Sequence, residues 1–258
     1  MDPRQKEINE RWTRGSDNYD RIIHDELASF RAEGWRDLIA AQTGSCPGLE
    51  VLDCGCGPAF FTIILAGAGF RVTGIDAAEG MLTKARRNTE RYGVEARILE
   101  MDCHALDFPD GSFDAVVSRN VTHALLDHVT VYREWLRVLR PGGTLLIFDA
   151  NWHLPYASEE MYRDSAERER KSIEIYGSDF SGKTVFDDNA EFAPGKRNTS
   201  HPLGDLVRPD WDCGILRAVG FTDITWDRDI TGPLWDDKEK LVYGNTPMFM
   251  VRAVKPET

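Results

Sequence analysis

The feature that most constrains the fold is an alternation of short apolar stretches with longer amphipathic ones between residues 49 and 150. Short apolar runs that end near Gly, Asp or Asn are typical of buried strands, and the longer stretches have the periodicity of helices. Strands separated by helices predict an α/β fold, in which helices cover both faces of a mainly parallel sheet. The expected strands are 49–54, 70–75, 96–101, 113–118 and 144–150, and the expected helices between them are 60–68, 78–92 and 129–139.

The first expected strand ends in the loop Asp53-Cys54-Gly55-Cys56-Gly57. Parallel sheets of this kind bind ligands beyond the carboxyl ends of their strands. Glycine lets the backbone turn sharply and approach a ligand closely, and the following helix begins with unpaired N–H groups. A Gly-x-Gly loop alone fits NAD, FAD and S-adenosylmethionine (SAM), and it also fits a tight turn that binds nothing.

The residues that flank this loop favour SAM over a dinucleotide. A dinucleotide would place its pyrophosphate over the loop, close to the carboxylate of Asp53. Two like charges at ~4 Å repel by about 4 kcal/mol at an effective dielectric constant of ~20. SAM has no phosphate and carries a sulfonium and an ammonium group, which a carboxylate attracts. Phe60 also stands where a dinucleotide site has its third glycine. An NAD(P)-dependent oxidoreductase is therefore the alternative, and it is disfavoured.

Polar side chains also follow the next expected strands. Asp76 ends the second strand, 21 residues after Gly55, where its carboxylate can accept hydrogen bonds from both hydroxyls of a ribose. Asp102 ends the third strand, where it can accept a bond from an adenine amino group or, alternatively, cap the following turn. Asn120 and His123 follow the fourth strand. The sequence therefore predicts a nucleoside site along one edge of the sheet.

These motifs, in this order, resemble the class I SAM-dependent methyltransferases. The matching pieces are Val-Leu-Asp-x-Gly-x-Gly at 51–57, Gly-Ile-Asp at 74–76, Asp102 before Pro-Asp-Gly-Ser-Phe-Asp, and Leu-Arg-Pro-Gly-Gly-x-Leu at 139–145. The chain looks most similar to the small-molecule branch that includes the ubiquinone and menaquinone C-methyltransferases. The resemblance covers roughly residues 17–150 and, less specifically, 209–254. It implies SAM as methyl donor, S-adenosylhomocysteine (SAH) as product, and a Rossmann-like sheet of seven strands whose last strand, 248–254, is antiparallel.

The resemblance also implies roles for individual residues. Gly55 and Gly57 would lie against the methionine part of SAM, with Asp53 near its amino end. Met81 would pack on the adenine. Tyr19, in the N-terminal helical region, would close over the cofactor. The full set of implied cofactor-binding residues is Tyr19, Asp53, Gly55, Gly57, Asp76, Met81, Asp102, Cys103 and Asn120.

The chain is expected to divide into four regions. Residues 1–46 would form helices that close over the cofactor, 47–150 the SAM-binding core, and 209–258 the rest of the sheet. Residues 151–208 break the alternation, and a connection of this length is typically a lid or a binding segment. We expect it to bind the methyl acceptor and to order when the acceptor binds. Its candidate acceptor-binding residues, which alternatively pack the insertion onto the sheet, are Asn151, Trp152, Tyr156, Tyr162 and Tyr176.

Three side chains are candidate catalytic groups. Methyl transfer from a sulfonium is an in-line displacement, to which alignment can contribute roughly 7–11 kcal/mol. A general base is needed only when the acceptor arrives protonated. His123 and His153 follow the fourth and fifth expected strands, and the resemblance implies that Tyr19 lies near the same edge. For either histidine a structural role is the alternative.

Composition limits the partners and the cellular location. The net charge of −12 disfavours a nucleic acid, so the acceptor is expected to be a small molecule or, alternatively, a peptide. No apolar run is long enough to span a membrane, and the start lacks the apolar stretch of a signal peptide, so a cytoplasmic protein is expected. The five cysteines and six histidines lack the spacing of a metal site. A monomer and a homodimer both remain open, as does a non-catalytic protein that binds SAM as a scaffold or sensor.

Overall fold

The sheet has seven strands in the order β3-β2-β1-β4-β5-β7-β6. A computed structural model describes residues 2–44, 47–177, 203 and 206–257. Strands β1 to β5 pair in parallel, and β7 runs antiparallel to both of its neighbours. This confirms the expected Rossmann-like sheet and its antiparallel last strand. The strands are β1 (Glu50–Cys54), β2 (Arg71–Asp76), β3 (Ala96–Glu100), β4 (Phe113–Arg119), β5 (Leu139–Asp149), β6 (Thr222–Asp227) and β7 (Phe249–Val254).

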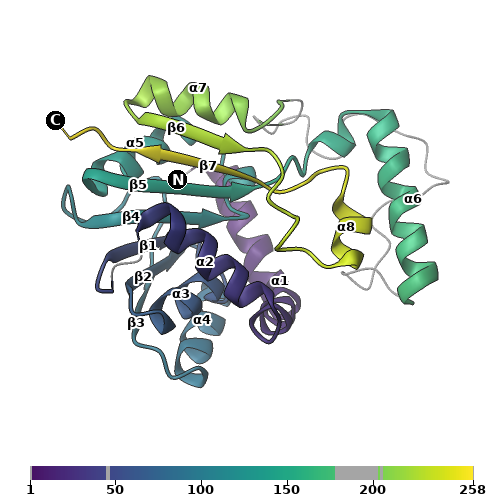
Figure 1. Ribbon diagram of the computed structural model, residues 1–258, viewed down its shortest axis with the longest axis horizontal. Helices are drawn as coiled ribbons and strands as arrows, with labels where there is room; N and C mark the ends of the chain where they lie inside the picture. Colours follow the sequence, from purple (N-terminus) through teal and green to yellow (C-terminus); the bar gives the residue numbers. More distant parts are fainter. Residues whose placement is uncertain (1, 45–46, 178–202, 204–205, 258) are drawn as a thin grey trace.

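Helices cover both faces of this sheet, as Figure 1 shows. On one face α2 and α3 pack Trp35, Ile39, Phe61 and Leu65 against β-strand residues such as Phe148, and α4 lies beside α3. On the other face α5 and α7 bury Tyr132, Trp135 and Leu216. The helices are α1 (Pro3–Leu27), α2 (Arg31–Thr43), α3 (Phe60–Gly67), α4 (Glu79–Arg91), α5 (His128–Val138), α6 (Glu159–Tyr176), α7 (Asp210–Val219) and α8 (Asp237–Tyr243), with the short 3-10 helices η1 (Thr122–Ala124) and η2 (Leu154–Tyr156).

The N-terminal region forms two helices separated at residues 28–30. Asp2 caps α1 by accepting a hydrogen bond from the N–H of Arg4, and Pro3 occupies the first turn, where no N–H is needed. Polar pairs dock α1 onto α4: Asp17 with Lys84, and Asp20 with both Arg87 and Asn88. Helix α1 is thereby fixed across the carboxyl edge of the sheet, where the sequence predicts a ligand site.

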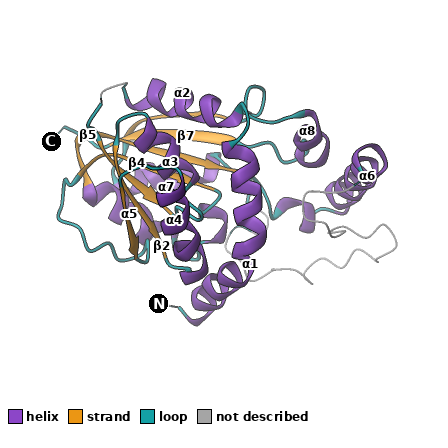
Figure 2. Ribbon diagram, turned by 90° about the horizontal axis from the view of Figure 1, so that it is seen from below, coloured by secondary structure: helices purple, strands orange, loops and turns teal. Residues whose placement is uncertain are grey.

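Helices α6 and α8 stand together beyond the carboxyl ends of the strands, away from the two layers that cover the sheet (Figures 1 and 2). Helix α8 is an element that the sequence patterns did not predict. Asp236 and Glu239 form a capping box at the start of α8, and Arg31 of α2 donates hydrogen bonds to both carboxylates. This ion pair joins the C-terminal part of the chain to the N-terminal helices. Residues 178–202, 204 and 205, which belong to the expected lid, lie outside the described residues.

Candidate active site

The loop after β1 has a conformation that requires glycine. Gly55 has φ +70°, and a Cβ atom at this position would lie 2.4 Å from Cγ2 of Val121. Gly57 has φ +53°, and a Cβ there would lie 3.5 Å from the ring of Tyr19. The N–H of Gly57 donates to Oδ2 of Asp76 at 3.0 Å. The loop is therefore held against β2 and leaves a cradle bounded by backbone rather than by side chains.

We expect Gly55→Ala to lower both stability and cofactor affinity. Alanine costs roughly 1–2 kcal/mol in a left-handed conformation, and here its Cβ would also overlap with the side chain of Val121, which lines the cavity. The thermal midpoint and the dissociation constant for SAH measure the two effects. The matched control is Gly15→Ala in α1, where a Cβ meets no atom within 4 Å. Since alanine favours a helix interior by about 0.5–1 kcal/mol, the control should be neutral or stabilising. Equal behaviour of the two variants would contradict the cradle.

Asp76 is held in one orientation at the end of β2. Its Oδ2 accepts the hydrogen bond from Gly57, and its Oδ1 accepts one from the N–H of Ala78 at 2.8 Å. Burial raises the pKa of Asp76, and the backbone N–H groups oppose this by stabilising the charged form. Each oxygen keeps further acceptor capacity, and Asp76 lines the neighbouring cavity. Asp76 is therefore placed to bind two hydroxyl groups.

A small cavity of about 90 Å³ lies between this loop and α1. Of the implied cofactor-binding residues, all except Asp53 line it. Helix α1 forms its cover with Gln5, Ile8, Asn9, Trp12 and Tyr19. The remaining lining residues are Gly55, Gly57, Asp76, Ala77, Ala78, Met81, Asp102, Cys103, Arg119, Asn120, Val121, Ala124 and Leu125.

Asp102 forms a turn with His104, as the alternative interpretation of this residue allows. Its Oδ1 accepts bonds from the backbone N–H of His104 at 3.0 Å and from Nδ1 of the same residue at 2.6 Å. Burial works to raise the pKa of Asp102, but the two hydrogen bonds from His104 outweigh it, so the pKa lies below the ordinary value. Asp102 is thus an oriented acceptor in the cavity wall, and the sequence reasoning missed the contribution of His104.

Asp53 lies behind the loop. It is buried, and its Oδ2 accepts hydrogen bonds from the N–H of Thr62 at 3.0 Å and from its hydroxyl at 2.7 Å. Burial raises the pKa of Asp53 to about 6, although the bonds from Thr62 act in the opposite direction. Asp53 does not line the cavity, because the first turn of α3 takes up its carboxylate. The structure thus gives it a role in fixing α3 to β1.

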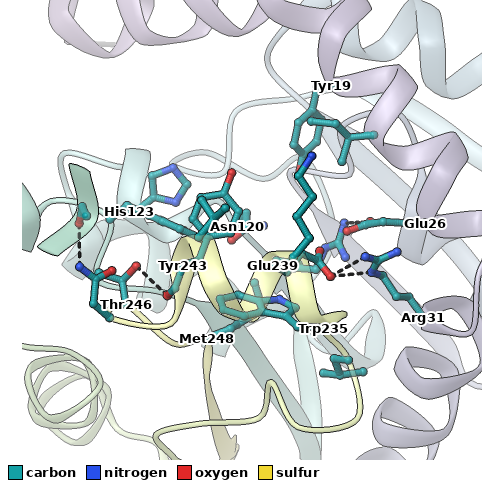
Figure 3. Close-up of a pocket in the computed structure, with 18 of the residues that line it drawn as sticks. Tyr19, Glu26, Arg31, Asn120, His123, Trp235, Glu239, Tyr243, Thr246 and Met248 are labelled. Carbon is teal, nitrogen blue, oxygen red and sulfur yellow. Dashed lines mark hydrogen bonds and ion pairs between the residues drawn. The ribbon is translucent and has the colours of Figure 1, made fainter. Parts of the chain in front are cut away.

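A second cavity, of about 630 Å³, opens beside the first. Figure 3 shows Tyr19 above it, Asn120 and His123 on one side, and Trp235 and Met248 below. Trp12, Tyr19, Arg119 and Asn120 line both cavities, so the two spaces meet at these side chains. The aromatic residues of the large cavity are Trp12, Tyr19, Trp35, Trp152, Tyr156, Trp235 and Tyr243.

A buried ion pair lies where the cavities meet. Nη2 of Arg119 donates to Glu26 at 2.7 Å, and the guanidinium lies 4.4 Å from the centre of the Phe60 ring. Burial raises the pKa of Tyr19, whose hydroxyl faces Arg119 and Asn120. Neither Arg119 nor Glu26 was expected in the site. They are 93 positions apart in the sequence, and no motif links them.

Asn120 has an unpaired acceptor at the same place. Its backbone is left-handed, with φ 55°, and is fixed by a hydrogen bond from its N–H to the carbonyl of Phe148. The side-chain Oδ1 is buried and accepts no hydrogen bond within the described residues. A buried unpaired acceptor costs about 1–3 kcal/mol, so Asn120 is suited to a ligand that donates a hydrogen bond.

His123 is oriented by Asp149, the last residue of β5. Nδ1 of His123 lies 3.0 Å from Oδ1 of Asp149, and the backbone N–H of His123 donates to Oδ2 at 2.8 Å. Burial acts to raise the pKa of Asp149, but His123 and Arg208 overcome it, so the pKa is strongly lowered. An ionised carboxylate only accepts, so Nδ1 of His123 carries the proton. In the neutral ring Nε2 is therefore the nitrogen without a proton, and His123 lines the large cavity.

The structure places the other candidate histidine differently. Nε2 of His153 lies 2.8 Å from the carbonyl oxygen of His123, and His153 lines neither of the two cavities that meet. Burial lowers the pKa of His153. Its position just past β5 suggested a catalytic role, but the imidazole turns back to donate to the loop that carries His123. His153 supports that loop.

The candidate acceptor residues separate into two groups. Trp152 and Tyr156 line the large cavity, and Nε1 of Trp152 donates to Asp149 at 3.1 Å. The other three do not line it. Asn151 pairs with the backbone of Arg208, Tyr162 packs edge-on against Tyr156, and Tyr176 is exposed near Lys238.

Within the described residues, no group of three or more His, Cys, Asp or Glu side chains could hold a metal ion. None of the helices that the structure describes is both long and apolar enough to cross a membrane. The cytoplasmic location and the oligomeric state stay predictions.

Comparisons with known proteins identify the core. The methyltransferase domain family matches residues 52–147. The demethylmenaquinone methyltransferase of Thermus thermophilus is 40% identical over 126 residues, which are 48% of this chain and 57% of that protein. Residues 52–147 therefore form a methyltransferase domain, and they lie within the seven-stranded sheet described above. The 2-methyl-6-phytyl-1,4-hydroquinone methyltransferase of Synechocystis is 42% identical to this chain over 106 residues, which are 41% of this chain and 33% of that protein. The chain spans 33–57% of the length of these two relatives.

Solved structures share the fold of the methyltransferase domain. A SAM-dependent methyltransferase of Methanococcus maripaludis, described as putative, has a TM-score of 0.61 at 20% identity, over 95% of this chain and 94% of that one. A phosphoethanolamine N-methyltransferase of Haemonchus contortus, solved with SAH, has a TM-score of 0.59 at 18% identity, over 86% and 52%. At these identities the likeness shows the fold alone.

The walls of the small cavity fit SAM, the cofactor of this family. Gly55 and Gly57 line the cavity without side chains, Asp76 offers two acceptor oxygens, and Asn120 offers an unpaired one. These groups match the ribose hydroxyls and the ammonium of SAM.

Proposed function

We propose that the protein transfers a methyl group from SAM to a small, mainly aromatic acceptor in the large cavity. The observation that carries this proposal is the meeting of the two cavities at Trp12, Tyr19, Arg119 and Asn120. A donor against the glycine loop would lie with its methionine part at this junction, next to an acceptor among the aromatic side chains. The names of the demethylmenaquinone and phytyl-hydroquinone methyltransferases similar to this domain support an acceptor with an aromatic ring.

The large cavity favours a small molecule over a peptide. Its volume of about 630 Å³ lies within the roughly 300–1,000 Å³ of small-molecule sites. Two of its carboxylates are already paired with arginines, Glu26 with Arg119 and Glu239 with Arg31. The aromatic rings thus supply the contact area, and a planar acceptor would gain the most from them.

His123 is the general base of this proposal. Bound SAM supplies an activated methyl group, and the protein contributes the alignment and removes the acceptor's proton. With Nδ1 held by Asp149, Nε2 of His123 can take a proton from a hydroxyl or an ammonium group in the large cavity. Tyr19, which lines both cavities, would orient the two ligands.

Two measurements test the proposal on the full chain. Calorimetric titration with SAH, and separately with NAD, should give binding of SAH alone. Incubation with methyl-labelled SAM and a panel of hydroxyaromatic compounds, aryl amines and short peptides should then give label transfer and SAH with a small aromatic acceptor. Binding of NAD without SAH would favour the oxidoreductase. SAH binding with no transfer to any acceptor would favour the scaffold or sensor.

A further inference from the structure

A buried ion network lies behind His123. Arg208 precedes α7, and its side chain is 1% exposed. Its Nε and Nη2 donate to the two carboxylate oxygens of Asp212 at 2.7 and 2.8 Å. Its Nη1 donates to Asp149 at 3.2 Å, and its Nη2 also donates to Thr122 at 2.6 Å. Arg208 therefore contacts both the carboxylate that orients His123 and the residue before His123.

Asp149 is fully saturated with hydrogen bonds. Oδ1 accepts from Nδ1 of His123, the N–H of Ala150 and Nε1 of Trp152. Oδ2 accepts from the hydroxyl of Thr122, the N–H of His123 and Nη1 of Arg208. Arg208 is the permanently charged donor in this set. Without it the buried carboxylate of Asp149 would lose its charge-assisted partner.

The network carries one net negative charge, because one arginine faces two carboxylates. Its other titratable members are neutral near pH 7. Burial lowers the pKa of His128 to about 4, lowers that of His153, and raises that of Tyr132 well above its ordinary value. The charged residues that line the cavity on the other side of His123 are Asp25, Glu26, Arg31, Arg119, Glu169, Lys238 and Glu239. Among them Glu26 pairs with Arg119, and Glu239 pairs with Arg31. A proton taken up by His123 would therefore bring the buried network to neutrality.

Arg208 also joins the two ends of the segment 151–208. The side-chain amide of Asn151 donates to the carbonyl of Arg208 at 3.1 Å, and the N–H of Arg208 donates to the amide oxygen of Asn151 at 2.9 Å. The two ends of the segment are thus joined at the residue whose guanidinium reaches Asp149.

We propose that Arg208 is a positioning residue for His123. It acts through Asp149 and Thr122, it fixes the imidazole with Nε2 toward the acceptor, and its charge sets the pH range in which His123 is a base. The proposal rests on the proposed function for the role of His123 as base. The contacts of Arg208 with Asp149 and Thr122 are independent of that role.

The test compares charge-changing variants by NMR titration of the His123 ring in the full chain with SAH, with the signal assigned by its loss in His123→Gln. Arg208→Met leaves two uncompensated carboxylates, so the midpoint of the His123 titration should rise by roughly one pH unit. Arg208→Met/Asp212→Asn restores the net charge of −1 and should return the midpoint close to that of the wild type. Arg208→Lys keeps the charge but not the forked geometry, so it should keep the midpoint.

Kinetics supply the second readout. With the acceptor found above, Arg208→Met should lower kcat and move the acidic limb of its pH profile to higher pH, with the KM for SAM unchanged. A His123 midpoint that stays the same in Arg208→Met would overturn the proposal, since a purely structural residue would alter stability alone. If Arg208→Met does not fold, Asp212→Asn provides the test, because it changes the charge of the network in the opposite direction. It brings the net charge of the network to zero, so the midpoint of the His123 titration should fall. An unchanged midpoint in this variant would contradict the proposal. The NMR result stands even if no methyl transfer is detected, so the two proposals can fail separately.

Discussion

His123→Gln is expected to lower kcat for methyl transfer by about 10²–10⁴-fold, the usual contribution of a general base. Glutamine is similar in reach and can still bond to Asp149, but it cannot take up a proton. The dissociation constant for SAH should stay the same, because His123 lines the large cavity and not the small one. Single-turnover rates with labelled SAM, together with SAH titration, separate the two effects.

The matched control for this variant is His24→Gln. His24 lies on α1 near Tyr92, the residue that follows α4, and lines neither of the two cavities. The His24→Gln variant should keep the wild-type kcat. A His123→Gln rate within tenfold of the wild type would show that the acceptor arrives already deprotonated, and it would remove His123 as base.

The small cavity was largely predictable because its residues share a place in the topology. Asp76, Asp102 and Asn120 each stand at or just beyond the carboxyl end of a predicted strand, and parallel strands bring those ends to one edge. The prediction fails where side-chain direction decides. Asp53 and His153 occupy suitable positions in the chain, yet one bonds to Thr62 and the other to the backbone of His123.

The ion pairs could not be predicted, because they join residues that are remote in sequence. Arg119 and Glu26 are 93 positions apart, and Arg208 reaches Asp149 over 59 positions. From the sequence alone, an arginine at the end of an apolar strand is expected to be exposed to solvent, because its buried partner is not known.

Helix α8 is a different case. The Asp-x-x-Glu pattern at 236–239 is a recognisable capping box that could have predicted this short helix.

Asp76→Ala is expected to weaken SAH binding by about 10²–10⁴-fold. Two hydrogen bonds from ribose hydroxyls to a carboxylate are worth roughly 1.5–3 kcal/mol each, and about 1.4 kcal/mol corresponds to a factor of ten in affinity. The variant also frees the N–H groups of Gly57 and Ala78, so part of the loss comes through the loop. Asp76→Asn separates these contributions, since its amide oxygen still accepts one of the two backbone bonds, whereas the charge, one acceptor and the other backbone bond are lost. It should bind more tightly than the alanine variant and less tightly than the wild type.

The control carboxylate for Asp76 is Glu79, three positions along the chain in the first turn of α4. Its side chain is 62% exposed and lines neither of the two cavities. Glu79→Ala should keep the wild-type affinity for SAH, because a carboxylate in solvent contributes little to binding at a distance. Calorimetry on the three variants measures the affinities, and thermal unfolding without ligand checks that each is folded. If Asp76→Ala bound SAH as tightly as Glu79→Ala, the ribose would have to lie elsewhere. If the affinity for SAH instead falls from the wild type to Asp76→Asn and again to Asp76→Ala, the result would place both ribose hydroxyls on the carboxylate of Asp76.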